Sequence, residues 1–101
     1  MTVTSTLSGD GSELQVVIKG RFDFSSHQDF RGTYENLPQK PSRYIIDMQD
    51  TAYLDSSALG MLLLLRDYAG GDNSDIQIIN TSADVKRILT ISNFEQLFSI
   101  S

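Results

Sequence analysis

The chain has 101 residues, enough for one domain with a single hydrophobic core, and its 13 acidic against 8 basic residues give a formal net charge of −5. This charge argues against nucleic acid as a partner, because nucleic-acid-binding proteins gain most of their affinity from basic patches. The absence of cysteine excludes disulfides and a thiol nucleophile, and it fits a reducing compartment. The start resembles no signal peptide, and the longest apolar run, residues 58–65, is too short to span a bilayer. We therefore expect a cytoplasmic protein with one domain, residues 1–101, and no membrane segment.

The first quarter of the chain predicts a β-hairpin. Residues 3–7 alternate weakly between apolar and polar side chains, and residues 14–18 are rich in β-branched side chains. The sequence Gly-Asp-Gly-Ser at residues 9–12 is typical of a turn between two strands. After the second strand, residues 20–24 are expected to leave the sheet.

A helix is predicted next, running to about residue 36. Ser25 or Ser26 can cap its amino terminus. Phe30, Tyr34 and Leu37 follow at spacings of four and three, which places them on one face of a helix.

The second half of the chain alternates between strands and helices. Residues 43–48 are predicted as a buried strand, and residues 75–79 are predicted as another strand. Between them, an apolar helix begins near Ser56 and ends around residue 69, before Gly-Gly-Asp-Asn. Residues 83–91 predict another helix, and residues 94–100 predict a last short helical piece that covers the sheet.

The predicted order is therefore strand, strand, helix, strand, helix, strand, helix, helix. The hairpin indicates an antiparallel edge, and the later strand–helix–strand unit indicates parallel pairing. We expect an α/β fold in which helices pack against a mixed sheet of about four strands.

The sequence Asp55-Ser56-Ser57 lies directly before the most apolar helix. Aspartate and serine are good N-caps, because their side-chain oxygens accept hydrogen bonds from unpaired backbone N–H groups. At least one of the two serines is therefore expected at the positive end of a helix, where its hydroxyl is accessible to partners. A phosphate added there would be stabilised by the helix dipole and the free amides. Helix capping alone would also account for these residues.

Residues 61–65 are five consecutive apolar residues within this helix. A helix that packs on one sheet needs an apolar stripe only about 100° wide. Five consecutive apolar residues surround the helix completely. Most of them are expected in the core, and the others are expected to face neighbouring helices or a partner.

Three stretches resemble the STAS family, which includes the anti-sigma factor antagonists and a domain of sulfate transporters. Residues 20–23 (Gly-Arg-Phe-Asp) resemble the Gly-x-hydrophobic-Asp that precedes the first helix of the family. Residues 44–60 resemble its central strand and phosphorylation loop, and residues 78–89 resemble its last strand and following helix. Ala58 stands where many members have glycine, and alanine is the better helix former.

The resemblance implies a switch controlled by phosphorylation. Its phosphoacceptor would be Ser56, directly after Asp55, with Ser57 as the fallback. In the family, the unphosphorylated antagonist binds an anti-sigma factor that is also the serine kinase and so frees a sigma factor, and a PP2C-type phosphatase removes the phosphate. The loop of Asp23 would lie beside the acceptor, and the partner-binding residues would be Asp23, Asp55, Ser56, Ser57 and Leu59. No catalytic residue, cofactor or metal is implied in the chain itself.

One alternative stays open and two others lack the residues they need. Some stand-alone members of the family are unphosphorylated accessory subunits, so this chain could serve a membrane-transport or other signalling assembly without modification. A receiver domain built on Asp47 and Asp50 would need a further acidic pair near the first strand and a lysine on a late strand. A catalytic triad of Ser56 with His27 would be expected in a Gly-x-Ser-x-Gly turn, which the sequence lacks.

Overall fold

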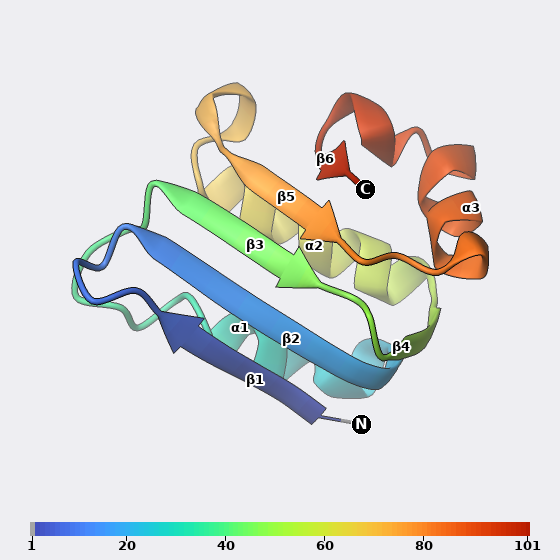
Figure 1. The fold of residues 1–101 in the computed structure, drawn as a ribbon, viewed down its shortest axis with the longest axis horizontal. Coiled ribbons are helices and arrows are strands. Elements are labelled where there is room, and N and C mark those ends of the chain that lie inside the picture. Colours follow the sequence, from blue (N-terminus) through green and yellow to red (C-terminus); the bar gives the residue numbers. More distant parts are fainter. Residues whose placement is uncertain (1) are drawn as a thin grey trace.

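A six-stranded sheet forms the centre of the computed structural model, which describes residues 2–101. Neighbouring strands follow the order β1-β2-β3-β5-β6, and β4 pairs with the end of β2 (Figure 1). The strands are β1 (Thr2–Leu7), β2 (Glu13–Phe22), β3 (Arg43–Asp47), β4 (Thr51–Leu54), β5 (Ile76–Ile79) and β6 (Ser99–Ile100).

Helices α1 and α2 lie behind the sheet in Figure 1, and α3 lies beside the carboxyl ends of the strands. Three short 3-10 turns complete the fold. The α-helices are α1 (His27–Gly32), α2 (Ser56–Tyr68) and α3 (Ala83–Ile91), and the 3-10 turns are η1 (Phe24–Ser26), η2 (Gly71–Asn73) and η3 (Phe94–Gln96).

The predicted mixed sheet is confirmed. Strands β1 and β2 form an antiparallel hairpin in which Leu7 lies opposite Leu14 and Val3 lies opposite Ile18. Strand β2 then pairs in parallel with β3, which pairs in parallel with β5. Residues 8–12 form the turn, where the Asp10 carboxylate accepts hydrogen bonds from the Ser8 and Ser12 hydroxyls.

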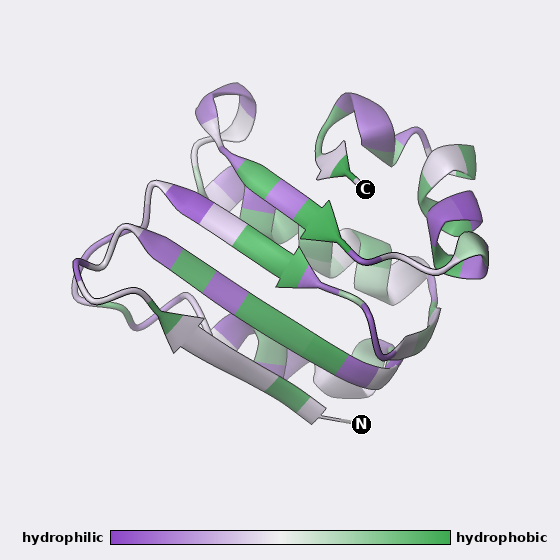
Figure 2. Cartoon of the chain, viewed as in Figure 1, coloured by the Kyte–Doolittle hydropathy of each residue, from purple (hydrophilic) through white to green (hydrophobic). Residues whose placement is uncertain are grey.

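The core lies between the sheet and its helices. Alternate residues of β2 are buried, as expected for a strand with one face covered, and Figure 2 shows apolar residues along β2, β3, β5 and α2. Helix α2 contributes four buried side chains on one face. Full burial of a leucine-sized side chain stabilises a fold by about 1.5–3 kcal/mol. The buried residues that α2 adds to the core are Ala58, Met61, Leu62 and Leu65.

The sheet contains two strands that the sequence did not indicate. Strand β2 continues to Phe22, so the prediction that the chain leaves the sheet over residues 20–24 is wrong. The pairing changes at Gly20, which has a φ of +84° and donates its N–H to the Asp50 carbonyl. There β4 replaces β3 as the neighbour of β2, and the buried Thr51 hydroxyl donates to the Ile18 carbonyl at 2.8 Å.

The second additional strand is β6, at the carboxyl end of the chain. The predicted helical piece over residues 94–100 ends at Gln96, and residues 99–100 pair with β5 instead. Phe94 and Phe98 are buried and stack on each other, so the apolar residues of this segment cover the core as expected.

Helix α1 is shorter than the sequence indicated, because it ends at Gly32 instead of residue 36. The Thr33 hydroxyl donates to the Phe30 carbonyl at 2.7 Å, a local hydrogen bond that competes with helix continuation. Phe30 and Tyr34 are nevertheless buried and Leu37 packs against the core, so all three side chains face the core, although only Phe30 does so from the helix.

Gly60 lies within α2, where the surroundings leave room for a larger side chain. An ideal Cβ at Gly60 would have no atom of another element within 4 Å. Alanine is about 0.8–1 kcal/mol more favourable than glycine inside a helix. Gly60→Ala should therefore raise the melting temperature by roughly 4–8 °C in circular dichroism. Gly70→Ala is the control, and it should lower the melting temperature because Gly70 has a φ of +119°. A lower melting temperature for Gly60→Ala would mean that the added methyl group collides with another part of the protein.

Candidate functional site

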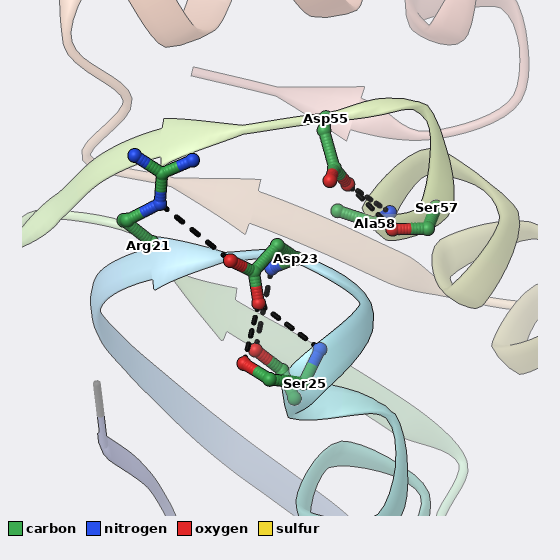
Figure 3. Close-up of polar contacts among 7 residues, drawn as sticks. Arg21, Asp23, Ser25, Asp55, Ser57 and Ala58 are labelled. Atoms are coloured by element: carbon green, nitrogen blue, oxygen red, sulfur yellow. Dashed lines mark hydrogen bonds and ion pairs between the residues drawn. The ribbon is translucent and has the colours of Figure 1, made fainter.

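Two aspartates emerge side by side from the carboxyl ends of paired strands (Figure 3). The parallel register of β2 and β4 places Phe22 beside Leu54, and Asp23 and Asp55 come directly after them. The backbone N–H of Asp55 also donates to the Phe22 carbonyl at 3.4 Å. The loop of Asp23 therefore lies beside the loop of Asp55, where the resemblance had placed it.

Asp55 is the N-cap of α2. Its backbone is extended, and its carboxylate Oδ1 accepts the backbone N–H of Ala58 at 3.0 Å and the Ser57 hydroxyl at 2.6 Å. The first two positions of the helix are consequently Ser56 and Ser57. Both serines lie at the positive end of α2, as predicted, although neither is the capping residue.

The two serines differ in accessibility. Ser57 is half-buried, and its hydroxyl is held by Asp55. Ser56 is exposed, and within residues 2–101 no hydrogen bond involves its side chain. The Ser56 hydroxyl is therefore the one that a partner can reach without breaking a hydrogen bond to Asp55.

Asp23 repeats the arrangement of Asp55 one strand away. Its Oδ1 accepts the backbone N–H of Ser25 at 3.0 Å and the Ser25 hydroxyl at 2.5 Å, which caps η1 (Figure 3). Its other carboxylate oxygen lies 3.5 Å from Nε of Arg21. Each aspartate thus fixes the turn that follows it by binding a serine two residues later.

Both carboxylates are stabilised in their charged form. The Ser57 hydroxyl and the Ala58 amide lower the pKa of Asp55, although the charge of Asp23 opposes this. The Ser25 hydroxyl, followed by the Ser25 amide and Arg21, lowers the pKa of Asp23. At neutral pH, Ser56 therefore has two negative charges close by and the amide groups of a helix terminus beneath it.

The outer face of α2 continues from Ser56 as an apolar surface. Leu59 is half-buried, and Leu63 is 42% exposed. They follow Ser56 at spacings of three and seven, so the three side chains lie along one stripe of the helix. Leu64 is 55% exposed beside this stripe. The prediction that part of residues 61–65 faces away from the sheet is confirmed.

Two exposed aromatic residues near the site were not indicated by the sequence. Phe24 follows Asp23 and is 75% exposed, and Tyr53 precedes the capped turn with the Arg21 guanidinium 4.7 Å from its ring centre. No local pattern marks Phe24 as exposed, because its burial depends on how η1 packs against the core.

His27 and Asp47, on which a catalytic triad or a receiver site would depend, have other partners in the structure. His27 stacks on Phe24, and no hydrogen bond links it to Ser56 in the described part of the chain. Asp47 accepts hydrogen bonds from the Gln49 backbone and the Asn80 amide at the end of β3. Among residues 2–101, no group of three or more His, Asp or Glu side chains could hold a metal ion. In the same residues, every helix is too short or too polar to cross a membrane.

Comparison with known proteins identifies a family and a close relative. A family model described as "Mlab, STAS domain" matches residues 5–99. A STAS-domain containing protein of Pseudomonas aeruginosa strain UCBPP-PA14, PA14_20770, is 58% identical over 101 residues, which cover all of both chains.

Solved structures of an anti-sigma factor antagonist and of a sulfate transporter family protein share the fold. The anti-sigma factor antagonist SpoIIAA in its unphosphorylated form matches with a TM-score of 0.71 and 12% identity, over 99% of this chain and 87% of that one. SpoIIAA of Bacillus in its phosphorylated form matches with a TM-score of 0.75 and 12% identity, over 99% and 91%. A sulfate transporter family protein of Wolinella succinogenes matches with a TM-score of 0.75 and 14% identity, over 93% and 80%. At these identities the similarity extends to the fold alone.

The cap predicts a specific pH dependence of stability. The pKa of Asp55 is lowered from 3.8, so its stabilising effect is complete above about pH 3.8 and is lost as the pH falls through its value in the folded protein. Asp55→Ala should have a lower melting temperature than the wild type at pH 7, and this gap should shrink below pH 4. Asp55→Asn, which keeps a capping oxygen, should stay close to the wild type at pH 7. A gap between wild type and Asp55→Ala that is constant from pH 7 to pH 2 would contradict the capping role.

Proposed function

This chain belongs to the STAS domain family, and we propose that it is an anti-sigma factor antagonist controlled by phosphorylation of Ser56. Its unphosphorylated form binds a cytoplasmic anti-sigma factor that is also the serine kinase, and this binding releases a sigma factor. A PP2C-type phosphatase reverses the modification, and the chain itself catalyses nothing. The observation that carries the proposal is the exposed Ser56 hydroxyl at the Asp55-capped end of α2.

Ser56 is the better acceptor than Ser57 for a geometric reason. Transfer of a phosphoryl group requires the hydroxyl oxygen to approach the donor phosphate in line. The Ser57 hydroxyl would first have to break its hydrogen bond to the Asp55 carboxylate. The Ser56 hydroxyl is free to react while the N-cap stays intact.

Phosphorylation changes the surface more than it changes the fold. A phosphate at a helix N-terminus gains about 0.3–1 kcal/mol from the dipole at exposed sites, so α2 tolerates it. It adds about −1.5 to −2 charges at neutral pH, beside Asp55 and Asp23. A partner that covers the stripe of Ser56, Leu59 and Leu63 would have to desolvate this charge, which costs several kcal/mol unless a basic group matches it. Unphosphorylated protein therefore binds the partner, and phosphorylated protein releases it.

The proposed partner surface contains two kinds of residue. Ser56 and Leu59 contact the partner directly, together with Leu63, which lies on the same stripe of α2. Asp23, Asp55 and Ser57 keep the two turns in shape through their hydrogen bonds, and the two carboxylates give the surface its negative charge.

A constitutive accessory subunit of a membrane-transport assembly is the second candidate function. The observation in its favour is the shared fold with the sulfate transporter family protein. In that role Ser56 would be an ordinary residue of a capped helix. The intact mass of the protein isolated from its native cells distinguishes the two functions, because only a phosphorylation switch yields a population with one added phosphate.

The acceptor is tested by phosphorylation in vitro. With the cognate kinase and ATP, the wild type and Ser57→Ala should each gain one phosphate that resists acid and hydroxylamine, as a serine ester does. Ser56→Ala should gain none, as measured by intact-protein mass spectrometry. Phosphate that is still incorporated by Ser56→Ala, or that hydroxylamine removes, would exclude Ser56 as the acceptor.

The direction of the switch is tested by calorimetric titration of the purified anti-sigma partner. Ser56→Ala should bind like the unphosphorylated wild type, whereas Ser56→Asp and Leu63→Glu should bind at least about tenfold more weakly, a loss of about 1.4 kcal/mol. Thr4→Glu, which adds a charge to the exposed edge strand β1, is the control and should bind normally. Genuinely phosphorylated protein is included because aspartate carries less charge than phosphoserine. Tighter binding by the phosphorylated form would reverse the proposed direction.

A further inference from the structure

Phe24 is a large aromatic residue that the fold does not use in its core. Its side chain is 75% exposed, whereas Phe22, two residues earlier, is fully buried. Its ring stacks against His27, with 6.2 Å between ring centres and 12° between planes. A shallow groove of about 300 Å³ runs beside it, lined by Phe24, Ser25, His27, Gln28 and Asp29.

The backbone on both sides of Phe24 is fixed. Asp23 accepts the Ser25 amide and hydroxyl, and the Asp23 backbone N–H donates to the Ser26 hydroxyl at 3.3 Å. Ser26 is completely buried, so this capping box is attached to the core. A partner that binds Phe24 therefore has to order little of the loop, which lowers the entropic cost of association.

Phe24 and Ser56 are corresponding residues of two adjacent turns. Each follows a capping aspartate, and each of these aspartates follows one member of the parallel pair Phe22 and Leu54. Paired strands lie about 4.8 Å apart, so the two turns leave the same edge of the sheet as neighbours. Helix α2 also lies against η1, so a protein that binds the start of α2 at Ser56 would reach the turn that carries Phe24.

We propose that Phe24 is an aromatic anchor that enters an apolar pocket on the protein that binds and phosphorylates Ser56. The proposal rests on the proposed function and adds the chemistry of the partner. Its pocket is bordered by basic or amide groups that match the carboxylates of Asp23 and Asp55, which fits a chain with a net charge of −5. Buried aromatic residues at the centre of an interface, surrounded by polar contacts, are typical of binding hot spots.

The test compares variants in calorimetric titration with the purified serine kinase that modifies Ser56. Phe24→Ala should bind at least about tenfold more weakly than the wild type, and Phe24→Leu should recover most of the affinity. Ile91→Ala is the matched control, because Ile91 is 74% exposed at the end of α3, and Figure 1 shows α3 apart from α1. It should bind like the wild type. The melting temperature of Phe24→Ala should stay close to that of the wild type, which separates a binding defect from a folding defect.

Phosphorylation kinetics give a second readout. Phe24→Ala should raise the KM of the kinase for this protein and leave kcat nearly unchanged, because Phe24 contributes to binding and not to the transfer step. Wild-type affinity and kinetics in Phe24→Ala would overturn the anchor and leave the proposed function intact, whereas a wild type that does not bind the kinase would overturn both. If sedimentation shows that the wild type dimerises through Phe24 while kinase binding is unaffected by Phe24→Ala, the occupant is a second copy of the chain and the proposal is wrong.

Discussion

The parallel pairing of Phe22 with Leu54 is the constraint on which the rest of the site depends. It ends β2 and β4 at the same edge of the sheet, so that Asp23 and Asp55 begin their turns side by side. The change of partner at Gly20 makes this pairing possible, because β2 can then extend beyond β3 to meet β4. The buried hydrogen bond from Thr51 to the Ile18 carbonyl holds β4 in this position. A loop in place of β4 would leave Asp55 without a fixed relation to Asp23.

At this edge, the Asp55 cap of α2 determines which serine hydroxyl is accessible for the proposed phosphorylation. The same carboxylate that holds the Ala58 amide also holds the Ser57 hydroxyl, which leaves Ser56 as the free hydroxyl of the first turn. Below it, the buried residues of α2 attach the helix to the sheet, while Leu63 and Leu64 remain exposed. A rigid helix with an accessible hydroxyl at its positive end can receive a charge without unfolding. In the proposed switch, that charge weakens the binding of a partner to the outer face of α2.

Much of this arrangement could be predicted from the sequence, and the exceptions have physical reasons. The hairpin, α2 and the capped turn at Asp55 were predictable because periodicity and capping chemistry are local properties. Strand β4 buries only its two end residues and so shows no alternation, and β6 has only two residues. Both form because β2 and β5 offer free edges. The distinction between Ser56 and Ser57 depends on a hydrogen bond that only the folded turn creates. The exposure of Phe24 likewise depends on where η1 sits against the core.

Backbone amide hydrogen exchange along α2, before and after enzymatic phosphorylation of Ser56, tests most directly whether the switch acts at the surface of a preformed site. With the cap intact, the Ala58 amide should keep its protection from exchange, and so should the buried turns of α2 around Leu62 and Leu65. Loss of protection throughout α2 on phosphorylation would contradict this view and would mean that the modification works by melting the helix.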